Sequence, residues 1–196
     1  MRRTTLLLAG VALLAACGSE PTATKSGRTP ALQNRAAASL HKSAVQQDLA
    51  ALRRATAAFH DTLAAQQAGY TTIVPLPTDP TITCLSDPTL GAMGIHYLNT
   101  SLAGDPSESV DAPEAMIYEP QKNGRLRLVG VEYLIPYALH PRDAAPPELL
   151  GQQFMHNDVF GVWMLHAYVW KHNPSGMFAT WNPRVSCQYA PPVPPA

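Results

Sequence analysis

The clearest indication of the fold is the sequence EAMIYEPQKNGRLRLVGVEYLI, residues 114–135. Two apolar segments, residues 114–121 and 126–135, flank the dipeptide Asn123-Gly124. Asn-Gly between two apolar segments is a strong local signal for a β-hairpin, because both residues accept the positive φ of a two-residue turn. The segment therefore predicts two antiparallel strands at the centre of the domain.

A two-residue turn also fixes which side chains share a face of this hairpin. One face carries Ile117, Leu128 and Leu134, and the other carries Met116, Val129, Val131 and Tyr133. Because both faces are apolar, both must be buried. We expect a helix on one face and a second layer, a partner or closure into a barrel on the other.

Further elements are expected on both sides of the hairpin. Residues 94–98 and 162–171 are predicted strands, and the proline-interrupted residues 136–158 are a predicted loop. Residues 37–68 are a predicted helix because apolar side chains recur every three or four residues, at Val45, Leu49, Leu52, Thr56, Phe59 and Leu63. The pattern lacks βαβ alternation. It predicts an α+β fold with one long N-terminal helix packed on a curved, mainly antiparallel sheet of four or more strands.

The N-terminus reads as a targeting signal. Arg2 and Arg3 precede an uncharged apolar stretch, residues 6–16, which is too short to span a bilayer. The stretch ends in Leu14-Ala15-Ala16-Cys17, which resembles the lipobox of bacterial lipoproteins. The alternative is an ordinary signal peptide with an incidental cysteine.

The lipobox resemblance implies a chain that is processed and anchored in the cell envelope, facing the periplasm or the exterior. Residues 1–16 would be removed as a signal peptide, and Cys17 would carry lipid that attaches the protein to a membrane. Residues 17–36 lack apolar periodicity and are expected to form a flexible spacer. A single α+β domain is expected over residues 37–189, followed by a proline-rich tail over 190–196.

The cysteine count predicts a disulfide if Cys17 carries lipid. Cys84 and Cys187 then remain as an even pair in an oxidising compartment. The expected bond would close a loop of about 100 residues. Two buried free thiols are the alternative.

Charge excludes one class of partner. The chain has 14 basic and 14 acidic residues, so its formal net charge is zero. Nucleic-acid binding needs an excess of lysine and arginine over acidic residues, which this chain lacks. We therefore expect no nucleic-acid partner.

Polar residues that interrupt apolar strands are the candidate site. Glu132 and His166 each interrupt a predicted strand, His96 lies in the strand before the hairpin, and Glu114 begins the hairpin. Buried carboxylates and imidazoles must be paired, neutral or metal-bound. These four residues could hold one divalent ion such as Zn²⁺, Fe²⁺ or Mn²⁺, or act as acid and base. A structural Glu–His hydrogen bond without a ligand explains the same pattern.

Aromatic side chains near these residues could line an apolar pocket, or could be ordinary core packing. The candidates for pocket lining are Tyr97, Tyr168 and Trp170.

Short strings across residues 45–187 resemble a family of uncharacterised secreted or lipid-anchored bacterial proteins. The resemblance implies one domain and no particular reaction. It rests on Ala68-Gly69-Tyr70, Gly91-Ala92-Met93-Gly94-Ile95-His96-Tyr97, Pro113-Glu114, Tyr118-Glu119-Pro120, Val131-Glu132-Tyr133, Leu165-His166, Trp170, Asn173-Pro174-Ser175-Gly176-Met177-Phe178 and Trp181-Asn182-Pro183.

Three functions follow as hypotheses. The first is an envelope lipoprotein that binds a metal ion or small ligand in a pocket over the sheet. The second is a small α+β enzyme that uses Glu132 or His166 as a general base. The third is a structural or interaction lipoprotein without a ligand.

Overall fold

The computed structural model describes residues 30–105 and 107–191. The expected signal peptide, Cys17, most of the spacer and the end of the proline-rich tail lie outside these residues. The helices are α1 (Pro30–Thr56), the 3₁₀ helix η1 (Ala57–His60), α2 (Thr62–Gln67) and α3 (Thr100–Ala103). The strands are β1 (Thr72–Ile73), β2 (Cys84–Asp87), β3 (Gly91–Leu98), β4 (Ala115–Pro120), β5 (Leu126–Pro136), β6 (Glu148–Leu149), β7 (Gln152–Gln153), β8 (Met155–Asn157) and β9 (Val162–Ala167).

One antiparallel sheet organises the domain and confirms the α+β class. Its order is β1-β3-β4-β5-β9-β8, with β2 also paired to β3, while β6 and β7 form a separate two-stranded sheet. The strands β6, β7 and β8 lie in residues 136–158, which were predicted to be a loop. The predicted strand over 162–171 ends at Ala167, because the Tyr168 backbone N–H donates to Met177 O instead. No helix in the described residues is both long and apolar enough to cross a membrane.

The helical segment differs from the single helix predicted over 37–68. The helix α1 begins at Pro30, inside the predicted spacer, and ends at Thr56. The Thr56 hydroxyl donates to Leu52 O, a bond that bends helices, and also accepts from Trp170 Nε1. Asp61 then caps α2 by accepting from the Leu63 N–H, so the chain starts a new helix there.

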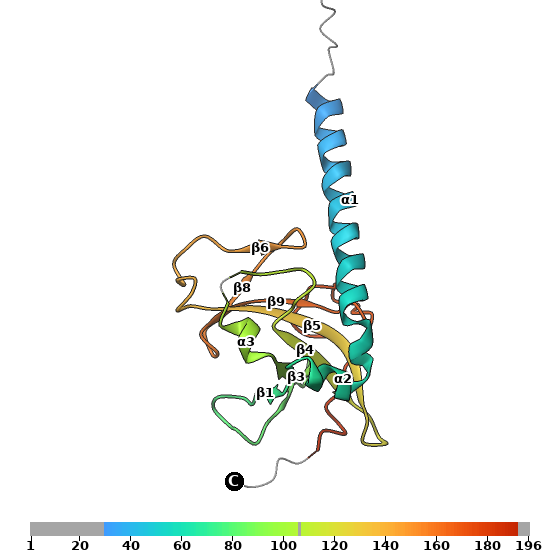
Figure 1. Cartoon of the computed structure of the whole chain (residues 1–196), viewed down its shortest axis with the longest axis vertical. Coiled ribbons are helices and arrows are strands. Elements are labelled where there is room, and N and C mark those ends of the chain that lie inside the picture. Colours follow the sequence, from blue (N-terminus) through green and yellow to red (C-terminus); the bar gives the residue numbers. More distant parts are fainter. Residues whose placement is uncertain (1–29, 106, 192–196) are drawn as a thin grey trace, which may run out of the picture.

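Only part of α1 packs on the sheet. Leu49 and Leu52 are buried in the main core with Met116, Tyr118 and Tyr133. Figure 1 shows the opposite end of α1 extending away from the sheet. Leu63 closes the predicted apolar stripe but is 58% exposed, because the helix break turns it away from the core.

The central hairpin corrects the predicted turn. Gly124 N–H donates to Gln121 O and Gln121 N–H donates to Arg125 O, which makes Lys122, Asn123 and Gly124 a three-residue loop. Gly124 has φ +76°, as such a loop requires at its last position. The loop shifts the register of its flanking residues by one position, so that Tyr118 opposes Leu128.

A β-bulge at Val129 then restores the predicted register. Ile117 opposes Gly130 and Ala115 opposes Glu132, which leaves Val129 as the extra residue of β5. Leu128 and Val129 therefore lie on the opposite faces from those predicted. Leu128 lies in the core under α1, and Val129 lies on the other face with Ile117.

The two faces of the sheet are covered differently. The α1 face holds the larger core, and the second face holds a smaller cluster of Ala92, Ile117, Val129, Tyr168 and Val185. The C-terminal segment covers part of this second face. A disulfide between Cys84 and Cys187, with 5.7 Å between their Cα atoms, confirms the predicted bond and fastens that segment to β2.

Candidate metal centre

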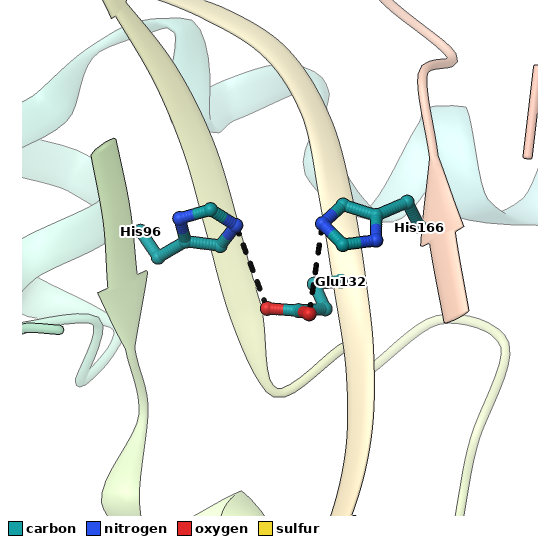
Figure 2. A group of neighbouring side chains, drawn as sticks. All are labelled: His96, Glu132 and His166. Atoms are coloured by element: carbon teal, nitrogen blue, oxygen red, sulfur yellow. Dashed lines mark ion pairs between the residues drawn. The ribbon is translucent and has the colours of Figure 1, made fainter. Parts of the chain in front are cut away.

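Three of the four predicted site residues meet on the second face of the sheet. Glu132 of β5 lies directly opposite His166 of β9. His96 of β3 is paired with Ile117 of β4, so its side chain approaches Glu132 diagonally across β4. The residue between β3 and Glu132 is Ala115, whose small side chain leaves room for the two to meet. Figure 2 shows the two imidazoles on either side of the Glu132 carboxyl group.

The distances in this group are longer than hydrogen bonds. His96 Nε2 is 3.5 Å from Glu132 Oε2, and His166 Nε2 is 3.6 Å from Glu132 Oε1. A hydrogen bond between nitrogen and oxygen is about 2.7–3.2 Å long. One atom from each residue lies within 4.8 Å of the others, as in a three-ligand metal site.

The group is buried and its polar atoms are poorly satisfied. His96 is 3% exposed, Glu132 9% and His166 0%. Among the described residues, neither ring nitrogen of His166 has a hydrogen-bond partner. Each such buried atom costs about 1–3 kcal/mol, so this arrangement reduces the stability of the fold unless something else pairs with these atoms.

Burial makes all three groups neutral near pH 7. It raises the pKa of Glu132 to about 8, and the Glu114 carboxyl adds to the shift. It lowers the pKa of His96 to about 4 and that of His166 to about 3. The free site therefore carries a protonated carboxyl and two neutral imidazoles.

Glu114, the fourth candidate, stays outside the group. It precedes β4, and its Oε2 accepts a hydrogen bond from the Leu134 N–H at 3.1 Å. Residue 115, next in sequence, is the one that shares a face with Glu132, so the side chain of Glu114 starts from the opposite face. Burial raises the pKa of Glu114 to about 7.

An apolar cavity of about 250 Å³ opens beside the group. His96 and Glu132 lie in its wall, together with Leu98, Leu134, Val162 and Phe160. The sequence prediction missed these apolar residues. Leu98 and Leu134 stand two positions after His96 and Glu132, so strand alternation already placed them on the same face.

The aromatic residues predicted to line the pocket lie elsewhere. Tyr97 packs on the α1 core, because it points to the opposite face of β3 from His96. Trp170 also packs on that core and donates to Thr56 Oγ1. Tyr168 lies in the smaller cluster, and its hydroxyl donates to Thr180 O rather than into the cavity.

Two imidazoles and one carboxylate are a ligand set that Zn²⁺, Fe²⁺ and Mn²⁺ accept. With metal–ligand bonds of about 2.0–2.1 Å, ligand atoms of a tetrahedral site are ~3.3 Å apart. The distances from the two imidazoles to the carboxyl, 3.5 Å to Oε2 and 3.6 Å to Oε1, are close to this value. Because the protein supplies three ligands, a tetrahedral ion would keep a fourth coordination position open for water or another ligand.

Comparison with known proteins does not add a family to this picture. No protein-family model, no curated protein and no solved structure matches the chain.

Proposed function

We propose that the protein is a cell-envelope lipoprotein whose domain binds one divalent transition-metal ion through His96, Glu132 and His166. The lipid on Cys17 would attach the chain to a membrane, as the Leu14-Ala15-Ala16-Cys17 lipobox implies. The domain would then face the periplasm or the exterior. The balanced charge of the chain supports the further expectation that nucleic acid is no partner.

One observation carries the metal proposal. Two buried imidazoles direct Nε2 at the two oxygens of one buried carboxyl, at 3.5 and 3.6 Å. A structural Glu–His pair would close to hydrogen-bond distance, because an unpaired buried polar group is costly. An ion between the three residues would instead satisfy the ring nitrogens and the carboxylate together.

Metal analysis of protein purified without chelator tests the proposal. We expect one divalent ion per chain, and a melting temperature that falls in chelator and is restored by zinc. Less than a tenth of an ion per chain, with a melting temperature insensitive to both chelator and zinc, would contradict the proposal.

The neighbouring buried carboxyl supplies a matched control. In Glu132→Gln the isosteric amide replaces a charged ligand, so zinc affinity should fall at least tenfold. In Glu114→Gln the amide oxygen can still accept the Leu134 N–H, and zinc affinity should stay within twofold of wild type. Equal losses in the two variants would mean that the carboxylate acts through general electrostatics and not as a ligand.

An acid–base enzyme is the second candidate. It is favoured by the pKa of Glu132, about 8, in a residue that lines a cavity. This function requires turnover that persists in chelator, varies with pH around 8 and disappears in Glu132→Gln. A metal-dependent activity would favour the first proposal instead.

A lipoprotein without a ligand is the third reading. It predicts a metal-free protein in which Glu132→Gln leaves every binding property unchanged. Intact mass spectrometry of native material tests the shared part of all these proposals. We expect a chain that begins at Cys17 and carries acyl groups, and a terminus without an acyl increment would contradict the anchor.

We also propose that the sheet is curved around the site. The bulge in β5 at Val129 supports this, as does the register shift of β2 against β3 between Leu85 and Ser86. Bulges bend and twist the strands that contain them.

A further inference from the structure

The cavity beside His96 and Glu132 is strongly apolar. Twelve residues line it, and all of them except His96, Glu132 and Asn157 are apolar. A ligand pocket of this composition buries hydrocarbon and fixes its orientation through the few polar groups. The ionisable groups in this wall, His96 and Glu132, are therefore two of the three proposed metal ligands.

A second apolar cavity, of about 310 Å³, adjoins the first. Both are lined by Leu85, Met93, Asn157 and Phe160. The second cavity is also lined by Ile82 and Val159, which are 40% and 58% exposed. The two cavities therefore lie against the same four side chains, and the second carries exposed apolar side chains at its wall.

Charge balance selects the head group of that ligand. A divalent ion held by one carboxylate and two neutral imidazoles leaves a net charge of +1 in a buried site. The described residues place no further carboxylate in the group, since Glu114 is hydrogen-bonded to Leu134 N–H. Buried charge is stable only when it is paired, so the open ligand position should attract an anion.

We propose that the protein binds a monocarboxylate with an unbranched hydrocarbon tail. The carboxylate would occupy the open position on the metal, and the tail would lie along Leu98, Leu134 and Phe160 toward the second cavity. This inference rests on the proposed metal site and names the ligand class of that same site.

Equilibrium dialysis of labelled octanoate against the full chain in phosphatidylcholine vesicles tests the proposal, with empty vesicles subtracted. Zinc content is measured in the same samples. We expect one octanoate per zinc-loaded chain, bound at least tenfold more tightly than by metal-free chain. Octanol has the tail without the anion, and acetate the anion without the tail, so both should bind at least tenfold more weakly than octanoate.

A cavity variant separates tail binding from metal binding. Ala103 lines the cavity at the end of α3 and is half-buried, so Ala103→Trp should retain zinc and lose octanoate at least tenfold. The control Ala38→Trp lies on the exposed part of α1 and should retain both. If Ala103→Trp does not fold, the comparison of octanoate with acetate decides the same point.

The outcomes distinguish the two proposals. Stoichiometric zinc without octanoate binding would overturn the ligand inference and leave the metal site standing. Octanoate that binds equally with and without zinc would also overturn it, because the anion would then not be on the metal. A chain that binds no zinc would overturn both.

Discussion

The two ends of the second sheet face each bury a glutamate, and they treat it in opposite ways. Glu119 of β4 receives Lys171 Nζ at 2.7 Å on both carboxylate oxygens and the Ser186 N–H at 3.0 Å. Among the described residues, Glu132 of β5 has two imidazole nitrogens nearby, at 3.5 and 3.6 Å, and no hydrogen bond. The first carboxylate is therefore paired within the protein, and the second is not.

The difference shows that one end of this face is fully hydrogen-bonded and the other is not. At the Glu119 end, the C-terminal segment is held by a salt bridge, backbone hydrogen bonds and the disulfide. At the Glu132 end, a cavity lies against the sheet, and buried ring nitrogens have no hydrogen-bond partner among the described residues. Unpaired buried polar atoms reduce stability, so this second end costs free energy that the first end and the α1 core offset.

Removing the disulfide should break the stable end most strongly. The bond joins residues 103 positions apart. Replacing both Cys84 and Cys187 by alanine should lower the free energy of unfolding by roughly 4–5 kcal/mol, because the unfolded chain regains the entropy of a long loop. Urea unfolding measures the change, and a loss below about 1 kcal/mol would show that the bond restrains little.

Removing the cation that pairs with Glu119 should cause the next largest loss of stability. In Lys171→Met the methylene packing is kept, but a buried carboxylate loses its cation, at a cost of about 3 kcal/mol. The control is Lys122→Met in the exposed hairpin loop, which should change stability by less than about 0.5 kcal/mol. Equal effects of the two substitutions would remove the contrast between the two glutamates.

Neutralising Glu132 should raise the free energy of unfolding, whereas the two changes above should lower it. Its pKa is raised to about 8 in the folded protein, so the stability it provides is complete below its ordinary pKa of 4.5 and is lost as the pH rises to 8. Metal-free Glu132→Gln should therefore be more stable than wild type at pH 8, by roughly 1–3 kcal/mol. Unfolding between pH 7 and pH 8 measures this, and most of the slope seen in wild type should disappear in the variant.

Glu114 and the two histidines also titrate, but mostly in other pH ranges. The pKa of Glu114 is raised to about 7, so Glu114→Gln should alter the slope mainly below pH 7 and contribute only a minor part of it between pH 7 and pH 8. The histidine pKa values are lowered to about 4 and 3, so the stability they contribute is complete above 6.5 and is lost as the pH falls toward those values. A wild-type slope between pH 7 and pH 8 that is undiminished in Glu132→Gln would contradict the assignment.

The smallest expected signal is a count of protons. At pH 6.5 the Glu132 carboxyl is protonated and both imidazoles are neutral, so zinc binding should release about one proton. Above pH 9 the carboxyl is already ionised, so a proton released there would come from water at the open ligand position of the zinc and not from Glu132. Calorimetry in buffers of different ionisation enthalpy gives the number. Release of two or more protons at pH 6.5 would mean that the histidines are charged in the free site.

The pairing around Glu132 could be predicted because the unpredicted loop residue and the unpredicted bulge shift the strand register in ways that cancel. The sequence indicates a two-residue turn at Asn123-Gly124, whereas the loop contains Lys122 as well. The bulge at Val129 corrects the register, so Glu132 opposes Ala115 as expected and only Leu128 and Val129 change faces. A bulge depends on tertiary contacts, here the Trp170 and Lys171 N–H groups that donate to Val129 O, so local patterns do not reveal it.

Other parts of the structure depend on contacts between distant residues. The helix break at Thr56 depends on Trp170, which lies 114 positions away. The cavity depends on β9 and on the loop after β8, which bring Val162 and Phe160 over His96. Strand alternation could place His96, Glu132 and His166 on one face, but the sequence alone did not show which of four candidates would be left out. Glu114 is excluded because a hydrogen bond to Leu134 N–H already occupies it.

A crystal structure of the zinc-loaded protein would locate the metal by its anomalous signal and is the strictest test of the three-ligand site. We predict one strong peak per chain, about 2.0–2.1 Å from His96 Nε2, His166 Nε2 and a Glu132 oxygen. Glu132→Gln should lose this peak. Zinc found only at surface residues, with Glu132 drawn to hydrogen-bond distance of either imidazole, would contradict the account.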